Sequence, residues 1–401
     1  MRLKTEGFGN IGKKDWILIT FALWFAVEIL LNTTIESVAG IPKDIINSFA
    51  NLIITSMLAV QIIILQKYTR GELLLIAMIT VLLLISAFNS RRLYLVSTWM
   101  FIVAAKYVDY ERLIRTAKHV LQVCVPMVIL LYFLGLIEDH TMYRGTDLRH
   151  SLGFAHPNTL GLRIFQWAAC LVYLTGKRSL KFFEILLLIF AAVFVYLIPN
   201  SQTAVFCLLL LIAGAFFLQI LMRKERNQKW FAVSVIVGSL LVNAGSVCLS
   251  LIDVFHYPVL KKLNQILSIR FSEGYKMYNL YGFTWLGQQV IGGENECRLA
   301  GITEVRYLDN SYLTLLLRYG IWVYLLFTIF FFLLLWKLYC LKQYKLLLLL
   351  SVNAVYGIME NSVYMMAYNI FIITMGMLVY RRKSVSGANE MGQKSQQENA
   401  Y

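Results

Sequence analysis

The chain has 401 residues, of which 59% are apolar and only 15% are charged, and its formal net charge is +15. Soluble domains carry roughly 25% charged residues, whereas a bilayer-spanning helix needs about 20 mainly apolar ones. The composition therefore excludes a soluble enzyme, a fibrous protein and a receptor with a single anchor, and the continuous apolar runs argue against a membrane β-barrel. No cleavable signal peptide is expected, because no small-residue cleavage site follows the first apolar run.

Apolar segments follow one another along the chain, and each predicts a transmembrane helix, because a backbone in lipid must satisfy its own hydrogen bonds. In chain order they are about 16–32, 45–66, 72–88, 93–105, 119–137, 157–175, 182–199, 203–222, 230–252, 311–336, 346–359 and 362–380. The sequence thus predicts an all-α polytopic membrane protein with about 12 transmembrane helices. One long extracytoplasmic loop, 253–310, is expected between helices 9 and 10.

The basic residues indicate the orientation. With the N-terminus inside, every inner connection is basic, while the short outer connections are poor in Lys and Arg apart from Arg91 and Arg92. This is the positive-inside pattern, so the net charge does not indicate a nucleic-acid partner. We expect a multi-pass protein of the cell membrane with both termini cytoplasmic. Residues 1–380 would form the membrane domain and 381–401 a disordered tail.

The first outer segment that could carry chemistry, 138–156, contains Arg144 and Arg149 and ends in His156-Pro157-Asn158. Proline suits the first turn of a helix, which predicts His156 as the N-cap. The positive end of the helix dipole would keep its imidazole neutral. A neutral imidazole could accept a proton or orient a sugar hydroxyl, and a plain helix start is the alternative reading.

The second outer segment, 253–310, is too polar to span a membrane, and loops longer than about 15 residues usually have a function. It contains Arg270 and Tyr281 and ends in Asp309, just before a predicted helix on which Asp309, Tyr312 and Leu316 would share one face. Asp309 could serve the chemistry or simply cap that helix. The tyrosines could stack on sugars or form an interfacial belt.

Two arginines, Arg163 and Arg318, lie within predicted helices, where a charged side chain by default marks a functional or paired site. No His, Cys and carboxylate spacing suggests a metal site, so neither metal nor cofactor is expected. The G-x-G-x-x-G run at 7–12 has no strand before it and does not predict dinucleotide binding.

Several blocks in the two outer segments together resemble a known family. They are Arg149, Ser151-Leu-Gly-Phe-Ala-His156-Pro157-Asn158-Thr-Leu-Gly161, Arg270, Tyr281-Gly282, Trp285-Leu-Gly-Gln288, Leu308-Asp309-Asn310-Ser311-Tyr312-Leu313 and Arg318-Tyr319-Gly320. The chain resembles the Wzy-type polysaccharide repeat-unit polymerases of the O-antigen ligase/polymerase superfamily, in particular the capsular and exopolysaccharide polymerases of Gram-positive bacteria. One departure is Ser201-Gln202-Thr203, where the family often has Ser-Arg-Thr.

The resemblance implies a glycosyltransferase that joins oligosaccharide repeat units carried on polyprenyl (undecaprenyl) pyrophosphate, at the outer face of the cytoplasmic membrane. The growing chain would be the donor, and a hydroxyl of the next lipid-linked unit would attack its reducing-end sugar. The implied partners are this lipid-linked oligosaccharide, the lipid bilayer, a flippase and a chain-length regulator.

Roles follow for the residues that match. A pyrophosphate leaving group suits the planar fork of arginine, so Arg149 and Arg270 are expected to act there. Asp309 is the favoured general base, with His156 as the alternative or as a substrate ligand. The expected substrate-binding residues are Arg144, Asn158, Arg163, Tyr281, Asn310, Tyr312 and Arg318.

Two other functions stay open. A ligase of the same superfamily would transfer finished glycan to a different acceptor with the same chemistry, although that branch often has His at the position of Asp309. A lipid-linked oligosaccharide flippase or other transporter would place its charges at the bilayer midplane, where only Arg163 and Arg318 are candidates.

Overall fold

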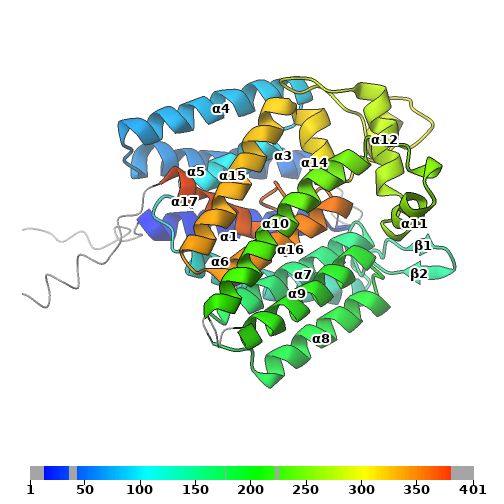
Figure 1. Ribbon diagram of the computed structural model, residues 1–401, viewed down its shortest axis with the longest axis horizontal. Helices are drawn as coiled ribbons and strands as arrows, with labels where there is room; N and C mark the ends of the chain where they lie inside the picture. Colours follow the sequence, from blue (N-terminus) through cyan, green and yellow to red (C-terminus); the bar gives the residue numbers. More distant parts are fainter. Residues whose placement is uncertain (1–12, 36–42, 177, 222–224, 381–401) are drawn as a thin grey trace, which may run out of the picture.

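The structure, a computed structural model, describes residues 13–35, 43–176, 178–221 and 225–380. Helices dominate these ranges, as the apolar runs predict (Figure 1). The predicted tail at 381–401 lies outside the described residues.

The long elements of the first half overlap the predicted segments, although one of them, Tyr110–Phe133, begins nine residues before the predicted start at 119. They are α1 (Lys13–Leu31), α3 (Lys43–Ala59) with its π-helical continuation η1 (Val60–Leu65), α4 (Arg70–Ser90), α5 (Tyr94–Ala104), α6 (Tyr110–Phe133), α7 (Pro157–Leu174), α8 (Phe182–Leu197) and α9 (Gln202–Leu221). One small feature departs from an all-α fold: β1 (Met142–Arg144) and β2 (Asp147–Arg149) pair as an antiparallel hairpin within the first outer segment.

The second half begins with α10 (Glu225–Leu249). The polar segment 253–310 is not an unstructured loop, because it folds into η2 (Val254–His256), α11 (Pro258–Ile266), α12 (Arg270–Tyr281) and α13 (Glu294–Leu299). The chain then returns through α14 (Ser311–Thr314), η3 (Leu315–Tyr319), α15 (Ile321–Cys340), α16 (Tyr344–Met359), η4 (Ile370–Met375) and α17 (Gly376–Val379).

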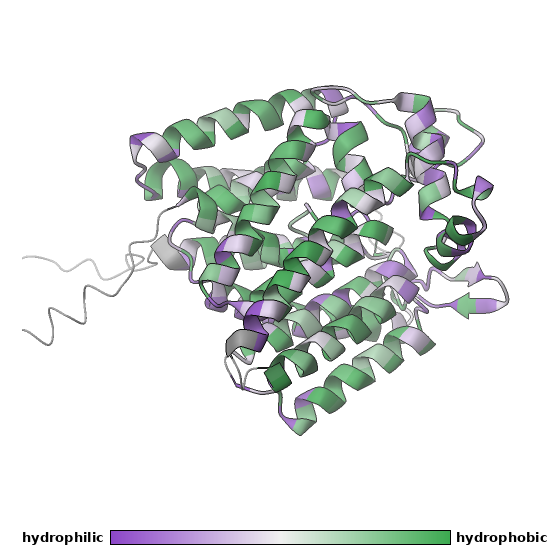
Figure 2. Cartoon of the chain, viewed as in Figure 1, coloured by the Kyte–Doolittle hydropathy of each residue, from purple (hydrophilic) through white to green (hydrophobic). Residues whose placement is uncertain are grey.

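Six helices in the described ranges are long and apolar enough to cross a membrane. They are Ile45–Leu65, Arg70–Ser90, Tyr110–Phe133, Gln202–Leu221, Asn227–Leu249 and Ile321–Cys340. Other apolar helices, such as α5, α8 and α16, are shorter. Hydrophobic residues follow the helices, and hydrophilic ones gather around the hairpin, α11 and α12 (Figure 2). These apolar helices indicate a membrane-embedded protein.

Connections predicted to share a membrane side do contact one another. At one end, ion pairs and hydrogen bonds join Asp15 to Arg112, Lys67 to Lys106 and Arg178 to Lys345. At the other end they join Thr34 to Glu138, Asn89 to Leu286, Arg92 to Glu296 and Arg149 to Pro199. The bundle therefore has two distinct ends, and the hairpin, α11 and α12 lie together at the second, on the right of Figure 1.

Two predicted helices are broken. The segment 311–336 turns sharply at Gly320, whose φ is 94° and which lies so close to Gly287 that a Cβ would meet the Gly287 nitrogen at 2.4 Å. Residues 360–369 are irregular, yet Ser362–Met366 and Asn369 are buried. Irregular backbone at membrane depth is tolerated where protein surrounds it. Because α14 begins at Ser311, the prediction that Asp309 shares a helical face with Tyr312 and Leu316 is wrong.

Candidate functional site

A cavity of about 520 Å³ opens at the end of the bundle that carries the hairpin and α12. Arginines and carboxylates face each other across it, and tyrosines add to its lining. The residues that line it are Met142, Arg144, Arg149, His156, Asn158, Thr159, Leu162, Arg270, Gly293, Glu294, Tyr307, Asp309, Tyr356, Glu360, Asn361, Ser362 and Tyr368. Six residues predicted for the site thus meet in one place, from segments up to 165 positions apart.

The hairpin places two of the arginines. Arg149 is 5% exposed, and its Nε donates to the carbonyl of Pro199 at 2.9 Å. Arg144 Nη1 donates to the carbonyl of Asn200 at 3.1 Å. Burial, and then the neighbouring charge of Arg144, lower the pKa of Arg149 to about 10, so it still carries its proton at pH 7. Two like charges held by neutral carbonyls favour an anionic ligand.

His156 is the N-cap of α7 with Pro157 in the first turn, as the sequence predicts. Its Nδ1 accepts the Asn158 backbone N–H at 2.9 Å, so the proton of the neutral ring is assigned to Nε2. Burial and the nearby Arg149 lower the pKa of His156 to about 4, which keeps the ring neutral at pH 7. In this arrangement the imidazole presents a hydrogen-bond donor to the cavity rather than a basic nitrogen.

Asn158 connects two groups of opposite charge. Its Oδ1 accepts from Arg149 Nη2 at 2.5 Å, and its Nδ2 donates to Glu360 Oε1 at 2.7 Å. The amide is therefore fixed in one orientation. A movement of Arg149 or of Glu360 would therefore be transmitted to the other residue through Asn158.

The opposite wall comes from α12 and the residues before α14. Arg270, the first residue of α12, forms an ion pair with Asp309 through its Nη1. Asp309 does not cap α14, because Asn310 does so by accepting from the backbone N–H groups of Tyr312 and Leu313 at 3.0 and 3.3 Å. Burial raises the pKa of Asp309, and Arg270 opposes this shift without cancelling it.

Glu360 is a cavity carboxylate that the sequence analysis missed. It follows α16, and its backbone carbonyl accepts the Ser311 hydroxyl at 2.7 Å, so α14 and α16 are joined beside the cavity. Burial, and then the negative charge of Asp309, raise the pKa of Glu360 to about 7. The available signal was a lone acidic residue between two long apolar runs, which is costly unless it has a role.

Five predicted site residues lie elsewhere, and three of them support the framework. Tyr312 is fully buried and donates to the Ala354 carbonyl at 2.8 Å. The Tyr281 hydroxyl holds the backbone of Ile291. Asn310, besides capping α14, donates to the Ser246 hydroxyl at 2.6 Å. None of the three lines the cavity.

The two intrahelical arginines also lie outside the lining. Arg318 donates to the Val290 carbonyl at 2.8 Å and approaches Glu296 to 3.5 Å, so it pairs within the outer segment. Arg163 is wholly buried and lies against the rings of Phe25 and Tyr368, with its Nη1 donating to the Ala367 carbonyl at 2.7 Å. Through Tyr368 it supports one side of the cavity.

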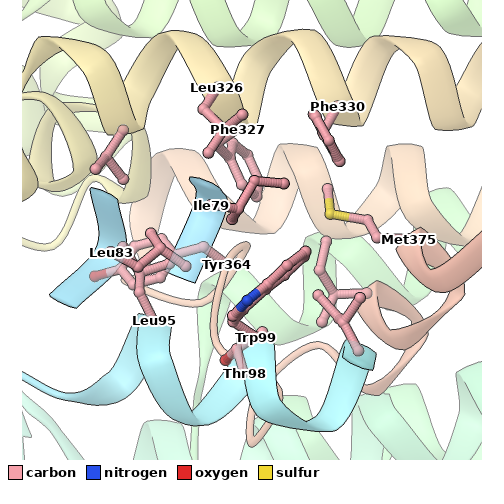
Figure 3. A pocket seen from close by; sticks show the side chains of 13 residues that line it. Ile79, Leu83, Leu95, Thr98, Trp99, Leu326, Phe327, Phe330, Tyr364 and Met375 are labelled. Carbon is pink, nitrogen blue, oxygen red and sulfur yellow. The ribbon is translucent and has the colours of Figure 1, made fainter. Parts of the chain in front are cut away.

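A second cavity, of about 60 Å³, is apolar and lies between α4, α5, α15 and η4. Figure 3 shows Trp99, Ile79, Phe327 and Met375 around it. Its lining contains a single ionisable side chain, Tyr364. This cavity therefore lacks the paired acidic and basic groups that polar chemistry needs. Across the described ranges, no three His, Cys, Asp or Glu side chains gather to hold a metal ion.

Comparison of the chain with protein-family models, with curated proteins and with solved structures gives no match.

Proposed function

We propose that this protein is a glycosyltransferase that polymerises polyprenyl-pyrophosphate-linked oligosaccharide repeat units into capsular or exopolysaccharide. The observation that carries the proposal is the meeting of three arginines with three carboxylates in one cavity at one end of an apolar helical bundle. The motifs that supply these residues are those that resemble Wzy-type polymerases.

The cavity suits a lipid-linked pyrophosphate glycan by size and charge. Its volume of about 520 Å³ lies within the 300–1,000 Å³ of typical ligand sites. Arg144, Arg149 and Arg270 would bind pyrophosphate oxygens and stabilise the charge that develops as the leaving group departs. Tyr307, which is 41% exposed, offers a ring on which a sugar could stack.

The membrane arrangement completes the proposal. We place both termini in the cytoplasm and the cavity at the outer face of the cell membrane, because the basic connections gather at the opposite end of the bundle. At that face the substrate would be delivered by a flippase, and product length would be set by a chain-length regulator.

The first test is Arg149→Lys in a host strain from which the gene has been deleted. Lysine keeps the positive charge but loses the bidentate fork, so we expect polymer formation to fall by about 10²–10³-fold. Arg91→Lys is the matched control, because Arg91 is an exposed arginine of a predicted outer connection. The measurement is the size distribution of surface glycans and of polyprenyl-linked glycans.

The deletion strain separates the alternatives. Loss of long polymer with single lipid-linked repeats persisting on the outer face supports a polymerase. Polymer that still forms but stays on its lipid indicates a ligase. Single repeats that accumulate only on the inner face indicate a flippase and contradict the proposal.

A further inference from the structure

Glu294, Asp309 and Glu360 line the cavity, and the last two have different partners. Asp309 is paired with the Arg270 guanidinium. Glu360 makes no ion pair within the described ranges, and the side-chain bond that fixes it is neutral, from Asn158 Nδ2 to its Oε1. A carboxylate held against an arginine is stabilised in its charged form and is a weaker base than one held by an amide.

Glu360 is also well placed. Asn361 and Ser362 line the cavity beside it, and the Ser311 bond to its backbone fixes its position. The bond between Ser311 Oγ and the Glu360 carbonyl anchors the backbone without using a carboxylate oxygen. Oε1 accepts from Asn158, which leaves Oε2 as the oxygen available to a ligand.

We propose that Glu360, rather than Asp309, is the general base of this cavity, and that the Arg149–Asn158–Glu360 hydrogen-bond chain aligns this base with the bound pyrophosphate. The inference rests on the proposed function. Asp309 then acts as a positioning residue, because it holds Arg270 against the leaving group.

Glu360 Oε2 takes the proton of the acceptor sugar hydroxyl as that oxygen bonds to the anomeric carbon of the donor. The bond from that carbon to the pyrophosphate oxygen breaks, and its electron pair leaves with polyprenyl pyrophosphate, whose charge the arginines stabilise. The proton on Glu360 then passes to solvent, and no oxidant, reductant or further reactant is required.

Positive, negative and neutral titratable groups surround the Glu360 carboxylate. This carboxylate interacts with groups from the hairpin, α12, the segment that leads into α14, α16 and the segment that follows α16. They are Arg144, Arg149, Arg270, Asp309, Tyr356 and Tyr368. Together with burial they set its pKa near 7, so the basic form grows as the pH rises through neutrality.

The test uses the full-length protein in membranes, with lipid-linked repeat units extracted from the deletion strain as substrate. Glu360→Gln keeps the shape and the acceptor for Asn158 but cannot take a proton, so we expect turnover to fall by about 10²–10⁴-fold. Glu304→Gln is the matched control, because Glu304 is an exposed carboxylate of the outer segment 253–310 and does not line the cavity. Inhibition of turnover by inorganic pyrophosphate reports whether the cavity arginines, Arg144, Arg149 and Arg270, can still bind an anion.

The pH profile distinguishes a general base from a residue with a purely structural role, because a structural substitution would leave the profile unchanged. The rate of the wild type should rise along an acidic limb near pH 7, and Glu360→Asp should keep such a limb at a shifted pH. Asp309→Asn should instead weaken inhibition by pyrophosphate and keep an acidic limb at lower pH, because the negative charge of Asp309 raises the pKa of Glu360.

The outcomes are distinct. A Glu360→Gln variant whose turnover falls by about 10²–10⁴-fold, and whose residual turnover pyrophosphate still inhibits, supports the inference. A Glu360→Gln variant within about 3-fold of an active wild type overturns the inference and leaves the proposed function standing. A wild type that forms no polymer from these substrates overturns both.

Discussion

His156 shows how a capping contact can determine what chemistry a side chain offers. An N-cap acceptor satisfies a backbone N–H that the helix leaves without a partner. When the acceptor is imidazole Nδ1, the neutral ring must carry its proton on Nε2, so the same contact makes the exposed nitrogen a donor. The cavity thus gains a neutral donor beside two arginines, which suits recognition of a sugar hydroxyl or a phosphate oxygen.

Asparagine separates the two roles of His156. Because asparagine is a good N-cap, His156→Asn should keep the start of α7, whereas His156→Ala should cost about 1 kcal/mol in stability. Both should lower polymer formation by about 10-fold or more if the Nε2 donor binds substrate. Thermal unfolding of the purified variants and glycan sizing measure the two effects. Equal activity of wild type and His156→Asn would exclude a substrate contact.

The pH dependence of stability should differ too. The folded protein keeps His156 neutral down to about pH 4, whereas its ordinary pKa is 6.5. As the pH falls below 6.5 the unfolded chain binds a proton that the folded chain excludes, so the wild type should lose stability relative to His156→Asn.

The individual residues also show how much of the site could be predicted from the sequence. His156 and Asn158 adjoin a proline at a helix start, so their placement follows from local chemistry. Glu360 follows α16 without any motif, and its role depends on Asn158, some 200 positions earlier. Arg318 and Tyr312 carried motif signals, but tertiary packing turned them toward Glu296 and Ala354.

At the scale of elements, the site depends on how closely α7 packs against α9. A Cβ at Gly161 of α7 would lie 2.7 Å from the Ser201 Cβ and 3.1 Å from the Ala204 Cβ. The close approach brings the carbonyls of Pro199 and Asn200 to Arg149 and Arg144. Helix packing in membranes often uses small residues in this way.

Gly161→Ala should therefore disturb both packing and arginine placement. Overpacking of a tight contact costs about 1–3 kcal/mol, and activity should fall because α9 must move away with the carbonyls. The partner change Ser201→Gly removes the nearest atoms and should partly restore both properties. Thermal stability and polymer formation of the single and double variants test this. The idea fails if Ser201→Gly gives no recovery.

The helices also show where an apolar run no longer predicts the backbone conformation. Apolar runs gave the helices because a helix in lipid is recognised by length and hydrophobicity. They could not give the turn at Gly320 or the irregular backbone of 362–369, because both lie within segments, 311–336 and 362–380, that are apolar enough overall to predict a helix. These breaks require the surrounding protein, through the approach of Gly287 in one case and burial in the other.

In the molecule as a whole, the connections between helices gather at two opposite ends of the bundle. This separation allows the site to lie at one end only. The contacts at one end involve Lys and Arg of the basic connections, and the cavity lies at the other. Charge alone predicted which connections share an end. It could not predict that 253–310 would fold into helices and bring Arg270 over the cavity, because that depends on the packing of Gly274 and Met277 in α12 against Leu313 of α14.

The orientation of these ends can be measured with single cysteines. In a variant with the native cysteines replaced, Glu304→Cys at the cavity end and Lys229→Cys at the basic end are both exposed. A membrane-impermeant maleimide applied to intact cells should label Glu304→Cys and leave Lys229→Cys unlabelled until the membrane is opened. This follows because lysine-rich and arginine-rich short loops stay in the cytoplasm. The reverse pattern would place the cavity in the cytoplasm, where nucleotide-activated donors are available, and would remove the reason for a lipid-pyrophosphate donor.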